Sequence, residues 1–154
     1  MKVLFLDIDG VLNTTSSLWK LRTDGSEDIG SKHLIQLSRI VHKTGCKIVL
    51  STSWRHFEPH IDTIKRRLLT AGIANDIIIS KTPDLFDGPR GHEISAWLKD
   101  HPEVTKFAVI DDDEDAGVLD DTSNFFKTSA THGLTSEIAD DIISHLKEEA
   151  KALA

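Results

Sequence analysis

Two aspartates follow the first apolar run of the chain and are separated by one residue. Asp7 and Asp9 come directly after the run from Val3 to Leu6, and Gly10 then allows a sharp turn. Residues two apart on a strand point to the same face, and ligands of α/β proteins bind at the carboxyl ends of strands. Carboxylates placed there can bind a metal ion, with one as nucleophile and the other as acid or base. For this pair alone, a polar strand end followed by a turn explains the pattern equally well.

A second apolar run, Lys106 to Ile110, ends in five consecutive acids, Asp111 to Asp115. In solvent these acids would form a plain charged loop, but after a buried strand we interpret them as half of a cation site. Hard divalent cations prefer carboxylate oxygens, and Mg²⁺ takes few protein ligands beside water and phosphate oxygens. The chain has one cysteine, so no paired-cysteine pattern indicates zinc. We therefore expect Mg²⁺ as the cofactor.

A third apolar run, Lys47 to Leu50, leads into residues with hydroxyl, aromatic and cationic side chains: Ser51, Thr52, Ser53, Trp54 and Arg55. Hydroxyls and backbone N–H groups at a strand-to-helix junction can cradle an anion, although Ser and Thr also cap helices. Beside two acidic strand ends, we interpret Ser51 and Thr52 as phosphate ligands. For Trp54 and Arg55, two roles fit equally well: stacking on a base and holding a second phosphate, or beginning a helix and packing.

These segments, in this order, resemble the haloacid dehalogenase (HAD) superfamily over residues 1 to about 130. Its first motif, an apolar strand followed by Asp-x-Asp-Gly and two apolar or Thr positions, is matched at Asp7, Asp9 and Gly10. Its second motif, a strand ending in Ser or Thr, falls on Ser51, and its fourth, a strand ending in an acidic pair, begins at Asp111. The segments Leu-Ser-Thr-Ser-Trp-Arg and Arg-Gly-His-Glu-Ile are similar to the small capless group related to phosphatase domains of RNA-repair enzymes.

The third motif of the superfamily is usually a lysine that steadies the charge of nucleophile and phosphate, and here this sequence departs from the pattern. The candidates are Lys81, after an apolar run, and Arg90, just before an expected helix. We favour Arg90, because the motif residue of capless members usually lies there, and we place Lys81 among the substrate-binding residues. Arginine keeps the charge and adds a planar fork for phosphate oxygens. Either residue can instead be a solvated surface cation.

The resemblance implies a Mg²⁺-dependent phosphomonoesterase that acts through an aspartyl-phosphate intermediate. It makes Asp7 the nucleophile, and Asp9 the acid that protonates the leaving oxygen and then deprotonates water. It places Mg²⁺ on Asp7, the backbone carbonyl of Asp9, and Asp112, while Asp111 orients a water or the third-motif cation. The partner is a phosphorylated substrate, with nucleotides or nucleic-acid ends as candidates. The alternative function is a regulatory module that binds phosphate at a degenerate, non-catalytic site.

The spacing of apolar residues predicts the elements that position these side chains. We expect strands at about 2–7, 46–51, 76–80, 105–111 and 123–127, and helices near 29–44, 58–72, 90–100 and 134–151. This alternation predicts an α/β fold, a three-layer Rossmann-like parallel sheet of about five strands with helices on both faces. The segments Asn13 to Glu27 and Lys81 to Pro89 are too short for a cap domain. The site is therefore expected to be open.

Length, charge and cysteine content fit one HAD-like hydrolase domain over residues 1–154. The net charge of −7 argues against a wide electrostatic surface for nucleic acid. Cys46 has no partner for an internal disulfide, which favours a reducing compartment. No signal peptide or membrane-spanning run is evident, so we expect a cytoplasmic protein without a membrane partner. The sequence leaves the oligomeric state open.

Overall fold

The computed structural model describes residues 1–18, 29–85, 88–117 and 122–148. Five parallel strands form one sheet, in the order β3-β2-β1-β4-β5. Their bounds are β1 Lys2–Leu6, β2 Lys47–Leu50, β3 Ile78–Lys81, β4 Lys106–Asp111 and β5 Phe125–Lys127. All five predicted strands are confirmed. The third begins two residues later than predicted, because the 3₁₀-helix η2, Asn75–Ile77, precedes it.

The α-helices whose full length is described alternate with the strands: α2 Ser31–Thr44, α3 Glu58–Thr70, α4 Arg90–Lys99 and α5 Ser136–Lys147. Two further 3₁₀-helices, η1 Ser53–His56 and η3 Glu114–Ala116, follow β2 and β4. The four predicted helices are confirmed. The last one ends at Lys147, because Glu148 has the extended backbone angles φ −63° and ψ 118°. The predicted continuation over 149–151 lies outside the described residues.

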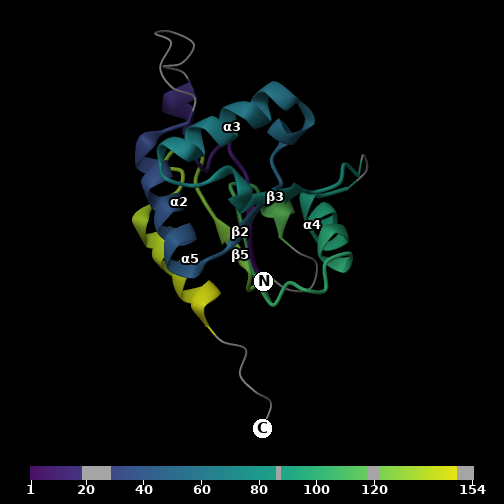
Figure 1. Cartoon of the computed structure of the whole chain (residues 1–154). Helices are drawn as coiled ribbons and strands as arrows, with labels where there is room; N and C mark the ends of the chain where they lie inside the picture. Colours follow the sequence, from purple (N-terminus) through teal and green to yellow (C-terminus); the bar gives the residue numbers. More distant parts are fainter. Residues whose placement is uncertain (19–28, 86–87, 118–121, 149–154) are drawn as a thin grey trace.

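Helices cover both faces of the sheet, as Figure 1 shows with α4 opposite the other three. Alternate residues of β1 explain the arrangement, since Leu4 and Leu6 pack in the larger core under α2, α3 and α5. Val3 and Phe5 point the other way, into a smaller core that includes Trp97 of α4. A parallel strand covered on both faces must be apolar throughout, which is why β1 shows no polar alternation. The predicted three-layer architecture is confirmed.

The register of the three central strands brings their carboxyl ends to one edge. Leu6 is aligned with Leu50 of β2 on one side and with Ile110 of β4 on the other. The next residue of each strand, Asp7, Ser51 or Asp111, therefore emerges at the same level. Backbone hydrogen bonds from Asp7 N to the Ile110 carbonyl and from Ser51 N to the Leu6 carbonyl continue the ladder there.

The described residues form no cap domain over this edge, in agreement with the predicted open site. Within the same residues, no helix is long and apolar enough to cross a membrane.

Candidate active site at the carboxyl edge of the sheet

Three carboxylates converge where β1 and β4 end. Asp7 is 4% exposed and Asp111 is fully buried. One oxygen from each of Asp7, Asp111 and Asp112 lies within 4.8 Å of the others. The turn after β1 passes close to this group, since a Cβ on Gly10 would clash with the carboxylate of Asp112. Gly10 also has a φ of +79°, so both the turn and the close approach require glycine there.

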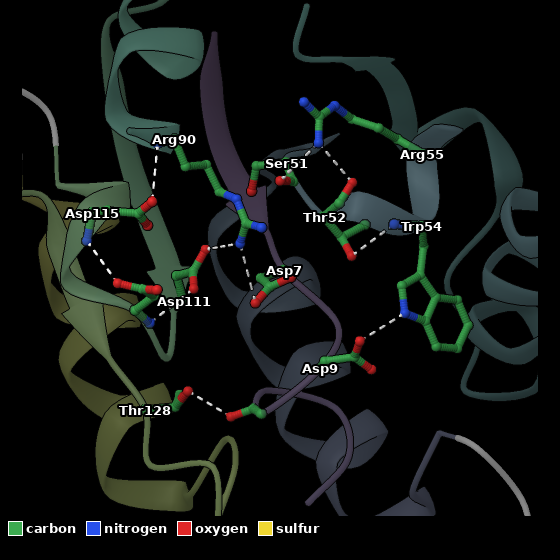
Figure 2. A network of polar contacts seen from close by, with 12 residues as sticks. Asp7, Asp9, Ser51, Thr52, Trp54, Arg55, Arg90, Asp111, Asp115 and Thr128 are labelled. Atoms are coloured by element: carbon green, nitrogen blue, oxygen red, sulfur yellow. Dashed lines mark hydrogen bonds and ion pairs between the residues drawn. The ribbon is translucent and has the colours of Figure 1, made fainter. Parts of the chain in front are cut away.

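Arg90, the first residue of α4, lies against the carboxylate cluster. Its Nη1 is 2.6 Å from Asp111 Oδ2 and 3.5 Å from Asp7 Oδ2, as Figure 2 shows. The other oxygen of Asp111, Oδ1, accepts a hydrogen bond from the backbone N–H of Asp113 at 2.9 Å. Asp111 is thus engaged on both oxygens and fixes the guanidinium beside Asp7. Arg90 therefore occupies a position from which a cation could act on both Asp7 and a bound phosphate.

Burial and the neighbouring carboxylates raise the pKa values of two acids in the cluster. Burial, together with the neighbouring Asp111, raises the pKa of Asp7 to about 8, although Arg90 opposes the rise. Burial and Asp111 also raise the pKa of Asp112. Burial alone would lower the pKa of Arg90, but Asp111 and Asp7 outweigh it and raise that pKa, so the guanidinium stays charged. One arginine does not neutralise the cluster, and a further cation would hold Asp7 and Asp112 ionised at neutral pH.

The donor set of this cluster fits a hard divalent cation. It consists of carboxylate oxygens alone, which suits Mg²⁺ better than a metal that prefers sulfur or imidazole. Asp7 and Asp112 were predicted as ligands and lie together, while Asp111 completes the group. The carboxylate of Asp9 lies outside this group. Asp9 could therefore contact the metal only through its backbone carbonyl, which is the atom that the resemblance implies.

Asp9 is exposed and held in place by two neighbours. Its Oδ1 accepts a hydrogen bond from Asn13 Nδ2 at 2.9 Å, and its Oδ2 accepts one from the indole Nε1 of Trp54 at 3.2 Å. Buried Asn13 also accepts from the backbone N–H of Gly10 at 2.9 Å, which closes the turn. The second carboxylate of the first motif therefore faces the open side of the site, separate from the metal cluster.

Ser51 and Thr52 differ in what their hydroxyls do. The Ser51 Oγ is buried and has no hydrogen-bond partner among the described residues. Figure 2 shows it on the side of Arg90 and Asp7. Thr52 Oγ1 instead accepts from the backbone N–H of Trp54 at 3.2 Å and caps η1, which was the alternative role for these hydroxyls. A buried hydroxyl without a partner is unfavourable by itself, so Ser51 is suited to donate to a bound oxygen.

Arg55 is a buried structural residue, 4% exposed. Its Nη2 lies 2.9 Å from Glu93 Oε2 on α4. Its guanidinium also donates to four backbone carbonyls, those of Ser51, Thr52, Thr82 and Pro83. These five hydrogen bonds use every N–H donor of an arginine, so none is left for a phosphate. These contacts fit a packing role for Arg55 and not the binding of a second phosphate.

Lys81 ends β3 and is exposed, with its Nζ 3.3 Å from the backbone carbonyl of Arg55. It lines a cavity of about 530 Å³ together with Trp97 and His101. The structure brings Arg90, and not Lys81, to the carboxylate cluster.

Trp54 is half-buried, and its ring lies against the ring of His60 on α3.

Several residues that shape the site were not identified from the sequence. Glu93 anchors Arg55 through their ion pair. Thr128 directly follows β5, and its Oγ1 donates a hydrogen bond to the Gly10 carbonyl at 2.6 Å. Asn13 could have been found, since Asn side chains commonly hydrogen-bond backbone groups of neighbouring turn residues. The partners of Glu93 and Thr128 lie far away in the sequence, and no local pattern indicates them.

Comparison with known proteins agrees with this geometry. A family model described as the HAD domain in Swiss Army Knife RNA repair proteins matches residues 3–139. No curated protein and no solved structure matches the chain. The family match covers the first, second and fourth motifs as well as Arg90, and it confirms the predicted resemblance. The chain belongs to the HAD domain family of Swiss Army Knife RNA repair proteins.

Proposed function

We propose that this protein is a Mg²⁺-dependent phosphomonoesterase that forms an aspartyl-phosphate on Asp7 and acts on nucleotide or polynucleotide ends. The observation that carries the proposal is the position of Asp7. It is buried beside Asp111 and Arg90, and near it lies the Ser51 hydroxyl, which has no partner among the described residues (Figure 2). A buried carboxylate flanked by a fixed cation and a free donor is suited to attack a phosphorus atom whose oxygens those groups hold.

In the first half of the reaction, an oxygen of Asp7 attacks phosphorus and the bond to the leaving oxygen breaks. Asp9 donates its proton to that leaving oxygen. Arg90 and Ser51 hold the equatorial oxygens of the phosphoryl group, whose transfer depends mainly on positioning and charge neutralisation. Asp111 keeps Arg90 in place through its 2.6 Å contact.

In the second half, Asp9 takes a proton from water, whose oxygen attacks phosphorus. The bond between phosphorus and Asp7 breaks, and inorganic phosphate leaves. Mg²⁺ held by Asp7, Asp112 and the Asp9 carbonyl would supply positive charge against the repulsion between carboxylate and phosphate. Asp9 is suited to both proton transfers, because it lies outside the carboxylate cluster and faces the open side.

Two features support a substrate with a nucleotide end. The family is that of RNA-repair proteins, and the described residues place no cap over the site, so a large molecule can approach the phosphate. The net charge of −7 opposes wide contact with nucleic acid. The contact is therefore small and lies close to the terminal phosphate.

The test is a comparison of kcat/KM in Mg²⁺ on four substrates: a 3′-phosphorylated oligonucleotide, a 5′-phosphorylated one, a mononucleotide and a hexose phosphate. We expect a nucleotide-containing substrate to be best, and excess EDTA to abolish turnover. If the hexose phosphate is best by about tenfold, a difference of about 1.4 kcal/mol, the nucleotide part of the proposal fails. Full turnover in EDTA would exclude the metal-dependent mechanism.

A further inference from the structure

Three aromatic rings extend from Asp9 across the surface at the start of α3. The indole of Trp54 touches Asp9 through its N–H, as Figure 2 shows. The ring centroid of His60 lies 5.3 Å from that of Trp54, and the centroid of Phe57 lies 4.8 Å from that of His60. The rings thus form a continuous row that begins at the carboxylate.

Packing does not account for the outer part of this row. Phe57 is 54% exposed and His60 is exposed as well, whereas Trp54 is half-buried against the larger core. A single exposed apolar side chain is common on protein surfaces, but contiguous aromatic rings beside a reactive site are characteristic of ligand contact. Phe57 and His60 are therefore free to accept a planar group.

The mechanism specifies which part of a substrate reaches these rings. Asp9 protonates the leaving oxygen, so the organic part of the substrate lies on the side of Asp9. Trp54 Nε1 is 3.2 Å from Asp9 Oδ2, and hence the ring row begins where the leaving group is attached. A nucleoside that leaves from this position carries its base outward over Trp54, His60 and Phe57.

We propose that Trp54, His60 and Phe57 form a stacking surface for the nucleobase next to the phosphate that is removed. The inference rests on the proposed phosphatase function and names the part of the substrate that this surface binds. Stacking on aromatic side chains tolerates any base, because every base has a π-face. The surface therefore selects nucleotides over sugar phosphates without reading their sequence.

A nucleobase suits the row better than the phenol ring of a phosphotyrosine. The phenol is bonded directly to the phosphate oxygen and would reach no farther than the indole beside Asp9. A base is separated from its phosphate by a sugar, and this separation carries it toward His60 and Phe57. Only a nucleobase would therefore contact the exposed rings of His60 and Phe57.

The test compares the wild type with Phe57→Ala and His60→Ala on two substrates. One is the 5′ or 3′ nucleoside monophosphate that the wild type hydrolyses better, and the other is the matching ribose phosphate without a base. The readout is the ratio of the two kcat/KM values. Stacking contributes enough per base that we expect this ratio to fall about fivefold or more in each variant. Phe57→Trp, which keeps an aromatic ring, should retain the ratio.

Leu69→Ala is the matched control, because Leu69 is 56% exposed on α3, near the end of the helix opposite to Phe57 and His60. This variant should leave the ratio unchanged. A ratio that stays at the wild-type value in Phe57→Ala and His60→Ala would overturn the stacking surface while the phosphatase function stands. So would a phosphotyrosine peptide that is hydrolysed better than any nucleotide.

Failure of the function itself has a different signature, namely no hydrolysis of either substrate by the wild type. In that case, calorimetric titration of adenosine monophosphate into the protein measures whether the three rings bind a base. Weaker binding to Phe57→Ala than to Leu69→Ala would support the surface, and equal binding would reject it.

Discussion

Arg55 and Glu93 form a buried ion pair, with Arg55 Nη2 2.9 Å from Glu93 Oε2 and side-chain exposures of 4% and 10%. Arg55 lies in η1 after β2, and Glu93 lies in the first turn of α4. The pair connects the two segments that carry the phosphate-binding candidates, Ser51 and Arg90. It therefore helps to set the distance between the Ser51 hydroxyl and the Arg90 guanidinium, which act on the same phosphoryl group in the proposed mechanism.

Breaking this pair should lower both stability and activity. Arg55→Met or Glu93→Leu leaves an uncompensated buried charge, which typically destabilises a protein by about 3–5 kcal/mol. Denaturant unfolding measures the loss. The double variant Arg55→Met/Glu93→Leu should recover part of the stability, because no lone charge remains, but not the activity, because the carbonyls of Ser51 and Thr52 lose their anchor. Single variants as stable as the wild type would contradict this account.

Arg90 and Lys81 should differ sharply in their effect on catalysis. Arg90 lies 2.6 Å from Asp111 and 3.5 Å from Asp7, whereas Lys81 Nζ lies near the backbone carbonyl of Arg55. Loss of a charge-stabilising donor costs about 3 kcal/mol, so Arg90→Ala should reduce kcat about 100-fold or more. Lys81→Ala should stay within a few-fold of the wild type. The reverse ranking in steady-state assays would assign the third-motif role to Lys81.

Without metal, the stability of the protein should fall as the pH rises from about 4 to 8. Burial raises the pKa of Asp7 from 3.8 to about 8, so across this window the folded state binds a proton that the unfolded state has lost. Stability decreases with pH wherever the folded state binds more protons, and the raised pKa of Asp112 acts in the same direction. Denaturant unfolding at pH 5 and pH 8 in EDTA measures the slope.

Mg²⁺ and Asp7→Asn provide the two controls for this pH dependence. Mg²⁺ binds only the assembled site, so it should raise the melting temperature and do so most at pH 8. Asp7→Asn removes the titrating carboxyl and should flatten the profile in EDTA. A wild-type stability that rises between pH 5 and 8 in EDTA would show that the pKa of Asp7 is not raised in the folded protein without metal.

Trp54→Phe separates the two contacts of the indole. The variant keeps an aromatic ring for stacking and removes the N–H that donates to Asp9 Oδ2. A positioned general acid typically contributes about 100-fold or more to the rate, so loss of the donor that positions Asp9 should lower kcat roughly tenfold on nucleotide and ribose phosphate alike. A fall confined to the nucleotide would mean that Trp54 acts by stacking only and does not position Asp9.

The elements and the reactive strand ends could be predicted from the sequence because their signals are local. The apolar run before Asp7 indicates a buried strand. Because β1 pairs in parallel with β2 and β4, the residues that follow these three strands lie at one edge of the sheet. The pairing of Arg55 with Glu93 could not be predicted. The two residues are 38 apart, and their contact depends on how closely η1 approaches α4.

The same distinction applies to Trp54 and Asp9. The sequence indicates that an aromatic residue follows the phosphate cradle, but its hydrogen bond spans 45 residues and depends on the turn that Asn13 closes. The exposure of Phe57 likewise follows from where α3 begins rather than from residue type. The motifs therefore indicate which residues are candidates for the chemistry, whereas tertiary packing decides which residues hold these candidates in place.

The central claim is that Asp7 carries the phosphoryl group, and trapping this intermediate tests it most directly. The enzyme is mixed with a substrate bearing radiolabelled phosphate in Mg²⁺, quenched in acid during turnover, and digested. We expect label on the peptide that contains Asp7, release of that label by hydroxylamine, and neither label nor turnover in Asp7→Asn. Wild-type turnover without labelled peptide, together with an active Asp7→Asn enzyme, would contradict the covalent mechanism.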